Sequence, residues 1–255
     1  MDTEYKHVMQ PVRVGRHLLK NRIIAAPVTL HSASNGEIYP TEAAMNFFVQ
    51  RAKAGAGLVV CAGVKLLPVG DDGEHASWDI YRHNAMNRLA ELAERIHFYG
   101  AAASMELIGI FEDGYTASAS GTLMDGMTRG REIPVSEMMR YKEGYAHAAQ
   151  MLMELGYDGI LLHFGHSIPV AQFLSPLTNS RTDQYGGSFE NRVRYLVEIL
   201  TAIRERVGDK LIIEVRMSAS EFKAGGIDIE EGLKIAEVFK QYADIVKKTT
   251  YLQGF

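Results

Sequence analysis

Short, apolar and β-branched segments alternate along the chain with longer segments of helical period. The short segments predict six strands, at residues 22–29, 58–64, 101–108, 159–164, 211–218 and 244–250. This alternation indicates repeated β-α units around a parallel sheet, and 255 residues suffice for one α/β barrel. We therefore expect an α/β fold of the TIM (β/α)8 barrel type, incomplete at about six units, as a single domain over residues 1–255.

Helices are expected between these strands. Residues 84–99 and 136–155 each carry an apolar stripe and end before a glycine, which is a typical helix end. Asp228, followed three residues later by Glu231, resembles a capping box that opens a third helix running to Phe239.

Composition and charge narrow the class of protein. The formal net charge is -4 and the basic residues are scattered, so we expect no nucleic-acid partner. A single cysteine, Cys61, excludes an internal disulfide and a thiolate metal cluster, and fits a reducing cytoplasm. No apolar stretch approaches the roughly 20 residues of a membrane span, and the first residues do not resemble a signal peptide.

Reactive side chains recur where the predicted strands end. In a barrel, chemistry gathers at the carboxyl ends of the strands and in the loops that follow, so the long connections 109–135 and 165–187 are candidates for an active site. The residues at these strand ends are Thr29, Cys61 with Ala62, Glu106, His163 with His166, and Arg216.

His163 and His166 are three residues apart, so both can face one ligand once the chain turns. Imidazole N–H groups can donate to a carbonyl oxygen and stabilise negative charge that develops there. The same pair could bind a metal, although neighbouring ligand candidates are sparse and no HExxH motif is present. Either histidine could also be an ordinary core residue.

Glu106 and Arg216 place charges inside apolar runs. A buried carboxylate is costly without a partner, so Glu106 needs one. The guanidinium of Arg216 could pair with Glu214, with Glu221 or with an anionic ligand.

The segment from Gln172 to Arg192, QFLSPLTNSRTDQYGGSFENR, carries a resemblance to a known family. It resembles the segment after strand four of old yellow enzyme homologues, which include 2,4-dienoyl-CoA reductases. Its Asn, Asp, Gly and Pro residues suit a fixed loop that feeds a helix. The resemblance extends over the whole chain. Residues 19–29 look like the first strand of that family, and single positions on the later strands match as well.

The resemblance implies an FMN barrel with NAD(P)H as electron donor and no metal. His163 and His166 match the pair that receives the substrate carbonyl in that family. The implied flavin contacts are Pro27, Val28 and Thr29 on strand one, Ala62 after strand two, Glu106 at the end of strand three, and Arg216 facing the pyrimidine end of the ring.

Three positions depart from the family pattern. Glu106 stands where a glutamine is usual, and Ile108-Gly109-Ile110 replaces a His-Ala-Gly run. Ile168 stands where a tyrosine often protonates the substrate, so protonation would need another donor or water.

The number of strands is a further departure, because a closed barrel has eight. In many barrels the loops after strands seven and eight bind phosphate. We therefore expect this chain by itself to hold FMN weakly or not at all, and to form homo-oligomers or self-associate through open sheet edges.

These observations favour an FMN-dependent ene-reductase that reduces the C=C bond of an α,β-unsaturated carbonyl compound. The partner would be a small enone or enoyl substrate, with no nucleic acid and no membrane. Two alternatives stay open: a barrel fragment without catalysis that binds a ligand or a partner chain, and a metal-dependent barrel hydrolase or lyase that uses the histidines with Glu106.

Overall fold

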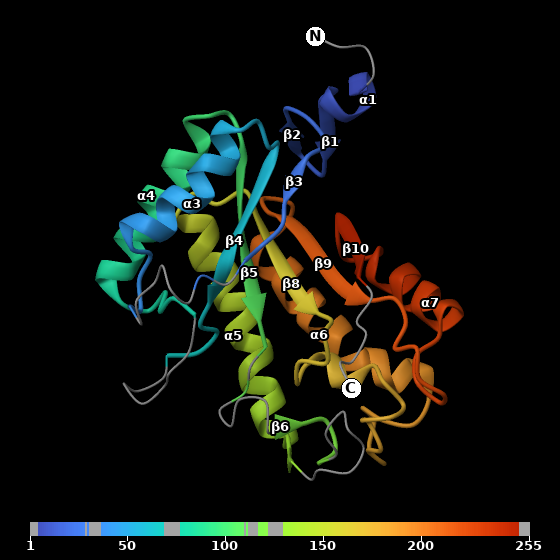
Figure 1. Cartoon of the computed structure of the whole chain (residues 1–255). Helices are drawn as coiled ribbons and strands as arrows, with labels where there is room; N and C mark the ends of the chain where they lie inside the picture. The colour runs from blue at the N-terminus through green and yellow to red at the C-terminus, as the bar shows by residue number, and fades with distance from the viewer. Residues whose placement is uncertain are drawn as a thin grey trace. The chain divides into compact units, whose positions relative to one another are not determined.

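The computed structural model describes residues 5–28, 30, 37–68, 77–109, 111, 117–121 and 130–249. Its main sheet has six strands in the order β3-β4-β5-β8-β9-β10, which is also their order along the chain (Figure 1). The pairs β3/β4, β4/β5 and β9/β10 are parallel. The strands are β3 (Ile24–Ala25), β4 (Leu58–Val64), β5 (Ala102–Ile108), β8 (Gly159–Phe164), β9 (Ile212–Ser218) and β10 (Ile245–Thr249). This confirms the predicted fold class, an incomplete α/β barrel of six strands.

The described helices alternate with these strands along the chain. They are α1 (Lys6–Met9), α3 (Glu42–Lys53), α4 (His83–His97), α5 (Val135–Glu154), α6 (Phe189–Val207), α7 (Ile229–Phe239) and a short 3-10 helix, η2 (Ala171–Phe173). Two short strand pairs lie outside the main sheet: β1 (Val12–Val14) with β2 (His17–Leu19), and β6 (Ala117–Ser118) with β7 (Arg131–Glu132). None of the described helices is both long and apolar enough to cross a bilayer.

The chain divides into two compact units. The first comprises residues Met1–Leu107, His147–Leu161 and Val207–Ile213. Every residue of β4 is buried, as expected for a parallel strand covered on both faces. Helix α3 contacts both α4 and β4 (Figure 1), and α4 buries Leu89, Leu92 and Ile96 in this core.

The second unit comprises residues Ile108–Ala146, Leu162–Arg206 and Glu214–Phe255. Aromatic rings fill its core: Phe164 lies 5.8 Å from Phe239 and 6.3 Å from Tyr145, centroid to centroid. Helix α7 begins as the sequence predicts, because the Asp228 carboxylate accepts a hydrogen bond from the Glu231 N–H at 2.8 Å. This cap satisfies one of the free N–H groups of the first turn.

The first predicted strand is the one that differs most from the structure. Only Ile24–Ala25 pairs with β4, whereas 22–29 was expected. Asn21 shapes the chain before the pairing begins, since its side chain accepts from the Ile23 N–H and donates to the Gly55 carbonyl. After the pairing, Pro27 has no N–H to donate to a sheet. Residue Thr29 lies outside the described residues.

Candidate functional site

Two imidazoles converge at the carboxyl end of β8, within the second unit. The Nδ1 atom of His166 lies 3.1 Å from the Nε2 atom of His163, and the ring centroids are 4.9 Å apart. His163 is 7% exposed and belongs to β8, whereas His166 follows the strand. The two histidines that the sequence singled out are thus brought together.

An unusual backbone turn produces this convergence. Gly165 approaches β9 so closely that a Cβ atom there would lie 3.2 Å from the Ser218 nitrogen. The next two residues, His166 and Ser167, have φ values of 54° and 58°. Non-glycine residues rarely adopt this left-handed conformation, and such residues cluster at functional sites. The Ser218 hydroxyl accepts a hydrogen bond from the His166 N–H at 3.1 Å, which fixes the start of the turn.

The other ring nitrogen of His166 faces β9 and β10. Its Nε2 atom lies 3.4 Å from Arg216 Nη2 and 3.3 Å from Thr249 Oγ1. Because a guanidinium only donates, the Nε2 atom of a neutral His166 would accept from Arg216. The ring proton would then lie on Nδ1, where it can donate to His163.

The two carboxylates that the sequence suggested as partners of Arg216 have contacts elsewhere. Glu214 is fully buried and forms an ion pair with Lys247 of β10. Glu221 accepts hydrogen bonds from the Ser175 hydroxyl at 2.8 Å and from the Ile227 N–H at 2.7 Å. Arg216 itself lies beside the His166 ring.

The remaining predicted flavin contacts belong to the first unit. Ala62 on β4 and Glu106 on β5 are buried, at 4% and 5% exposure, while Val28 is 44% exposed and Pro27 is half-buried. Cys61, beside Ala62, is fully buried, and burial raises the pKa of its thiol. A reactive role for Cys61 therefore has no support from its surroundings.

Three neighbours of the histidines were not predicted as site residues. Ser218 and Thr249 are paired residues at the ends of β9 and β10, and the register that joins them emerges only when the strands align. Gln172 was included in the family-like segment but was interpreted as scaffold. Its amide Nε2 donates to the Ser167 carbonyl at 3.2 Å.

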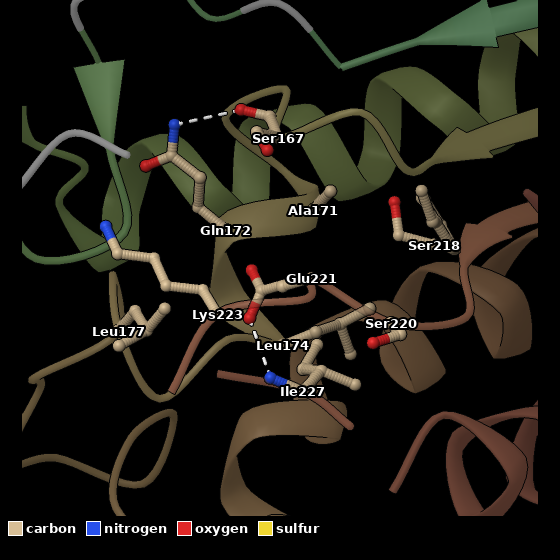
Figure 2. A pocket seen from close by; sticks show the side chains of 11 residues that line it. Ser167, Ala171, Gln172, Leu174, Leu177, Ser218, Ser220, Glu221, Lys223 and Ile227 are labelled. Atoms are coloured by element: carbon tan, nitrogen blue, oxygen red, sulfur yellow. Dashed lines mark hydrogen bonds between the residues drawn. The ribbon is translucent and has the colours of Figure 1, made fainter. Parts of the chain in front are cut away.

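A small pocket lies beside the turn (Figure 2). Its lining combines apolar side chains with polar groups from the end of β9 and from the segments that follow β8 and β9. The polar lining residues are Ser167, Gln172, Ser218, Ser220, Glu221 and Lys223. In Figure 2 the Gln172 amide points toward the Ser167 backbone, and Glu221 is held by Ile227.

The described residues contain no group of three or more His, Cys, Asp or Glu side chains that could hold a metal ion. The metal-dependent alternative therefore gains no support from this part of the chain.

The chain matches a known protein family along most of its length. Residues 7–253 match the model of the NADH:flavin oxidoreductase / NADH oxidase family. The chain is 31% identical to an NADH oxidase of Thermoanaerobacter brockii over 94% of its own length and 38% of the relative's. It is 28% identical to a cinnamate reductase of Clostridium sporogenes, over 93% and 40% of the two chains.

Among solved structures, a 2-naphthoyl-CoA reductase in complex with 2-naphthoyl-CoA superimposes with a TM-score of 0.86 at 25% identity. The match covers 98% of this chain and 41% of that one. The chain thus spans about two fifths of the length of these three proteins.

Proposed function

Because the chain belongs to the NADH:flavin oxidoreductase / NADH oxidase family, we propose that it works as an FMN-dependent ene-reductase. The reaction would reduce the C=C bond of an α,β-unsaturated carbonyl compound with NAD(P)H as the electron source. The observation that carries the proposal is the convergence of His163 Nε2 and His166 Nδ1. The similarity to a cinnamate reductase supports the same substrate class.

FMN and a nicotinamide nucleotide are the cofactors of this family. The donor set around β9 fits a flavin, because the half-buried guanidinium of Arg216 supplies a positive charge and N–H donors suited to a reduced ring and its carbonyl oxygens. FMN, when bound, supplies the hydride that the reaction needs. We propose Arg216, Pro27, Val28, Thr29, Ala62 and Glu106 as the residues that hold it.

The two histidines would bind the substrate carbonyl oxygen. At 3.1 Å their facing nitrogens are within hydrogen-bond distance of each other. An arriving oxygen would replace that contact and accept from His166 Nδ1–H, and it would accept from His163 as well once the ring proton of His163 lies on Nε2. Negative charge that develops on this oxygen would then be stabilised by fixed donors. Arg216 and Thr249 hold the far side of His166 and so orient its ring.

The reduction of the C=C bond also needs a proton for the α-carbon of the substrate, and in this proposal the proton comes from solvent. Ile168, where the resemblance leads one to expect a tyrosine, is 4% exposed and carries no acidic proton. Its backbone carbonyl is already used, since it accepts from the N–H groups of Ala171 and Gln172. This residue therefore packs the loop and takes no part in proton transfer.

The test is spectroscopic. The protein would be reconstituted with FMN, reduced with NADH or NADPH without oxygen, and then mixed with 2-cyclohexenone. We expect the flavin absorbance to be lost on reduction and restored by the enone. A flavin that is reduced but never reoxidised by enones would contradict the substrate class. Absence of flavin reduction and of enone reduction even with FMN in large excess would favour the alternative of a non-catalytic, ligand-binding chain.

A further inference from the structure

The left-handed turn at His166 and Ser167 needs support from outside itself. Neither residue is glycine, yet both have positive φ values. A residue that carries a side chain is strained in this backbone conformation, so contacts elsewhere must hold the turn. The Ser218 hydroxyl holds the His166 N–H, and the Gln172 amide holds the Ser167 carbonyl at 3.2 Å.

Gln172 is itself firmly placed. It lies in the 3-10 helix η2 and is 3% exposed. Its backbone N–H donates to the Ile168 carbonyl, and its own carbonyl accepts from the Thr178 hydroxyl at 2.9 Å. The side chain therefore reaches the turn from a fixed base.

The amide is costly at this position. A carbonyl oxygen only accepts, so the amide atom that faces the Ser167 carbonyl must be the donor Nε2. The other atom of the side-chain amide is therefore the acceptor Oε1. That Oε1 atom is buried, and no hydrogen-bond partner for it occurs among the residues that the structure describes. An apolar side chain of the same size would avoid this unsatisfied group. The donor to Ser167 is the one feature of glutamine that such a side chain could not supply.

We infer that Gln172 is a positioning residue, which fixes the Ser167 carbonyl and thereby the turn that aims His166 at His163. The inference rests on the proposed function only in that the positioned histidine would bind a substrate oxygen. Both Gln172 and Ser167 line the small pocket beside the turn. Ser218 secures the first half of the turn and Gln172 the second.

The test compares Gln172→Met, which cannot donate, with Gln172→Glu. A protonated glutamic acid can donate to the Ser167 carbonyl, whereas its ionised form cannot. Leu177→Met is the matched control, because Leu177 lines the same pocket and its backbone N–H donates to the Ser175 hydroxyl at 3.1 Å, not to the turn. The readouts are the ring-nitrogen NMR signals of His166 and the exchange rate of its amide proton, in the full chain.

We expect Gln172→Met to shift the ring signals of His166 and to speed amide exchange about three- to ten-fold, as loss of one hydrogen bond implies. The Leu177→Met control should leave both unchanged. Gln172→Glu should match the wild type at low pH and the methionine variant at high pH. This pH-dependent rescue would not arise from a packing role.

Unchanged His166 signals in Gln172→Met, or a difference between Gln172→Glu and the wild type that is the same at every pH, would overturn the inference. Should Gln172→Met fail to fold, Gln172→Glu titrated within one folded sample gives the same decision. Enone reduction is measured separately. Shifted His166 signals in a protein that cannot reduce enones would refute the proposed function and leave the positioning role intact.

Discussion

The Nε2 atom of His163 and the Nδ1 atom of His166 lie 3.1 Å apart, although strand β8 ends between the two residues. A strand that simply continued would place the third residue along far from the first and on the opposite face. The contact exists because the chain turns back immediately after Gly165. The first prediction follows from this pair.

His163→Ala and His166→Ala should slow the substrate half-reaction and leave reduction of the flavin by NAD(P)H nearly unchanged. Loss of one donor to a developing oxyanion typically costs about 10²–10³ in rate. Stopped-flow measurement of the two half-reactions checks this, with His83→Ala, at the exposed start of α4, as the control. Equal losses in both half-reactions would instead point to damaged flavin binding.

A second prediction concerns pH and the pair His97 and Asp158 in the first unit. His97 Nε2 lies 2.6 Å from Asp158 Oδ2, and this hydrogen bond raises the pKa of His97 above its ordinary 6.5. Burial alone would raise the pKa of Asp158, but hydrogen bonds from His97 and from the Ala103 N–H outweigh it and lower that pKa below 3.8.

The directions of these two pKa shifts determine the pH range in which the pair stabilises the folded protein. The contribution of His97 is fully present below pH 6.5 and is lost as pH rises through its raised pKa. The contribution of Asp158 is present above pH 3.8 and is lost as pH falls through its lowered pKa. Stability from this pair is therefore greatest between these limits and declines on the alkaline side.

Asp158→Ala should lower the free energy of unfolding by about 1–3 kcal/mol near pH 5.5, because the Ala103 N–H loses its acceptor. It should also reduce the difference in stability between pH 5.5 and 9. Urea denaturation at both pH values measures this. Asp209→Ala removes a carboxylate that is 81% exposed and should change little. The same pH dependence in Asp158→Ala as in the wild type would refute the assignment.

Cys61 should resist thiol reagents in the folded protein. Its side chain is fully buried on β4, and burial raises the pKa of the thiol, so little thiolate is available to react. We expect reaction with a disulfide reagent to be at least about 100-fold slower than in denaturant. Absorbance of the released thiolate gives the rate, and rapid stoichiometric labelling of the native protein would contradict the burial of this strand.

Arg181 should be the strongest single anchor of the segments around β6 and β7. Its guanidinium donates to the carbonyls of Ala119 and Ile133, both at 2.8 Å, and to Asp183 at 2.6 Å, and its side chain is 5% exposed. Arg181→Met should destabilise the protein by about 3 kcal/mol, because buried acceptors lose their donor.

The exposed Arg194 offers the matched control, since Arg194→Met should stay within about 0.5 kcal/mol. Thermal unfolding measures both variants, and limited proteolysis should detect faster cleavage at β6 and β7 in Arg181→Met only. Equal stability of the two variants would show that the cluster around Arg181 contributes little.

Much of the fold was readable in the sequence. The strands at 58–64 and 159–164 were predicted at their observed bounds, and 101–108 and 211–218 within one residue. Strands buried on both faces are continuous apolar runs, and helices with one buried face have their own period, so both leave a local signal. The first strand was overestimated because apolar residues before and after Ile24–Ala25 look the same whether or not they pair.

Part of the candidate site was also predicted from the sequence. The positions of His163, His166 and Arg216 at strand ends, and the family-like segment from Gln172 to Arg192, were determined by the sequence alone, because strand ends and motifs are local features.

Only the tertiary structure decided how the two histidines face each other. Local preference would place glycine or asparagine, not histidine and serine, at positive φ. The groups that hold this conformation are Ser218, 52 residues away along the chain, and Gln172, which reaches back from the next helical turn. A strained backbone is stable only where distant contacts compensate for it, and such contacts form only when the strands assemble.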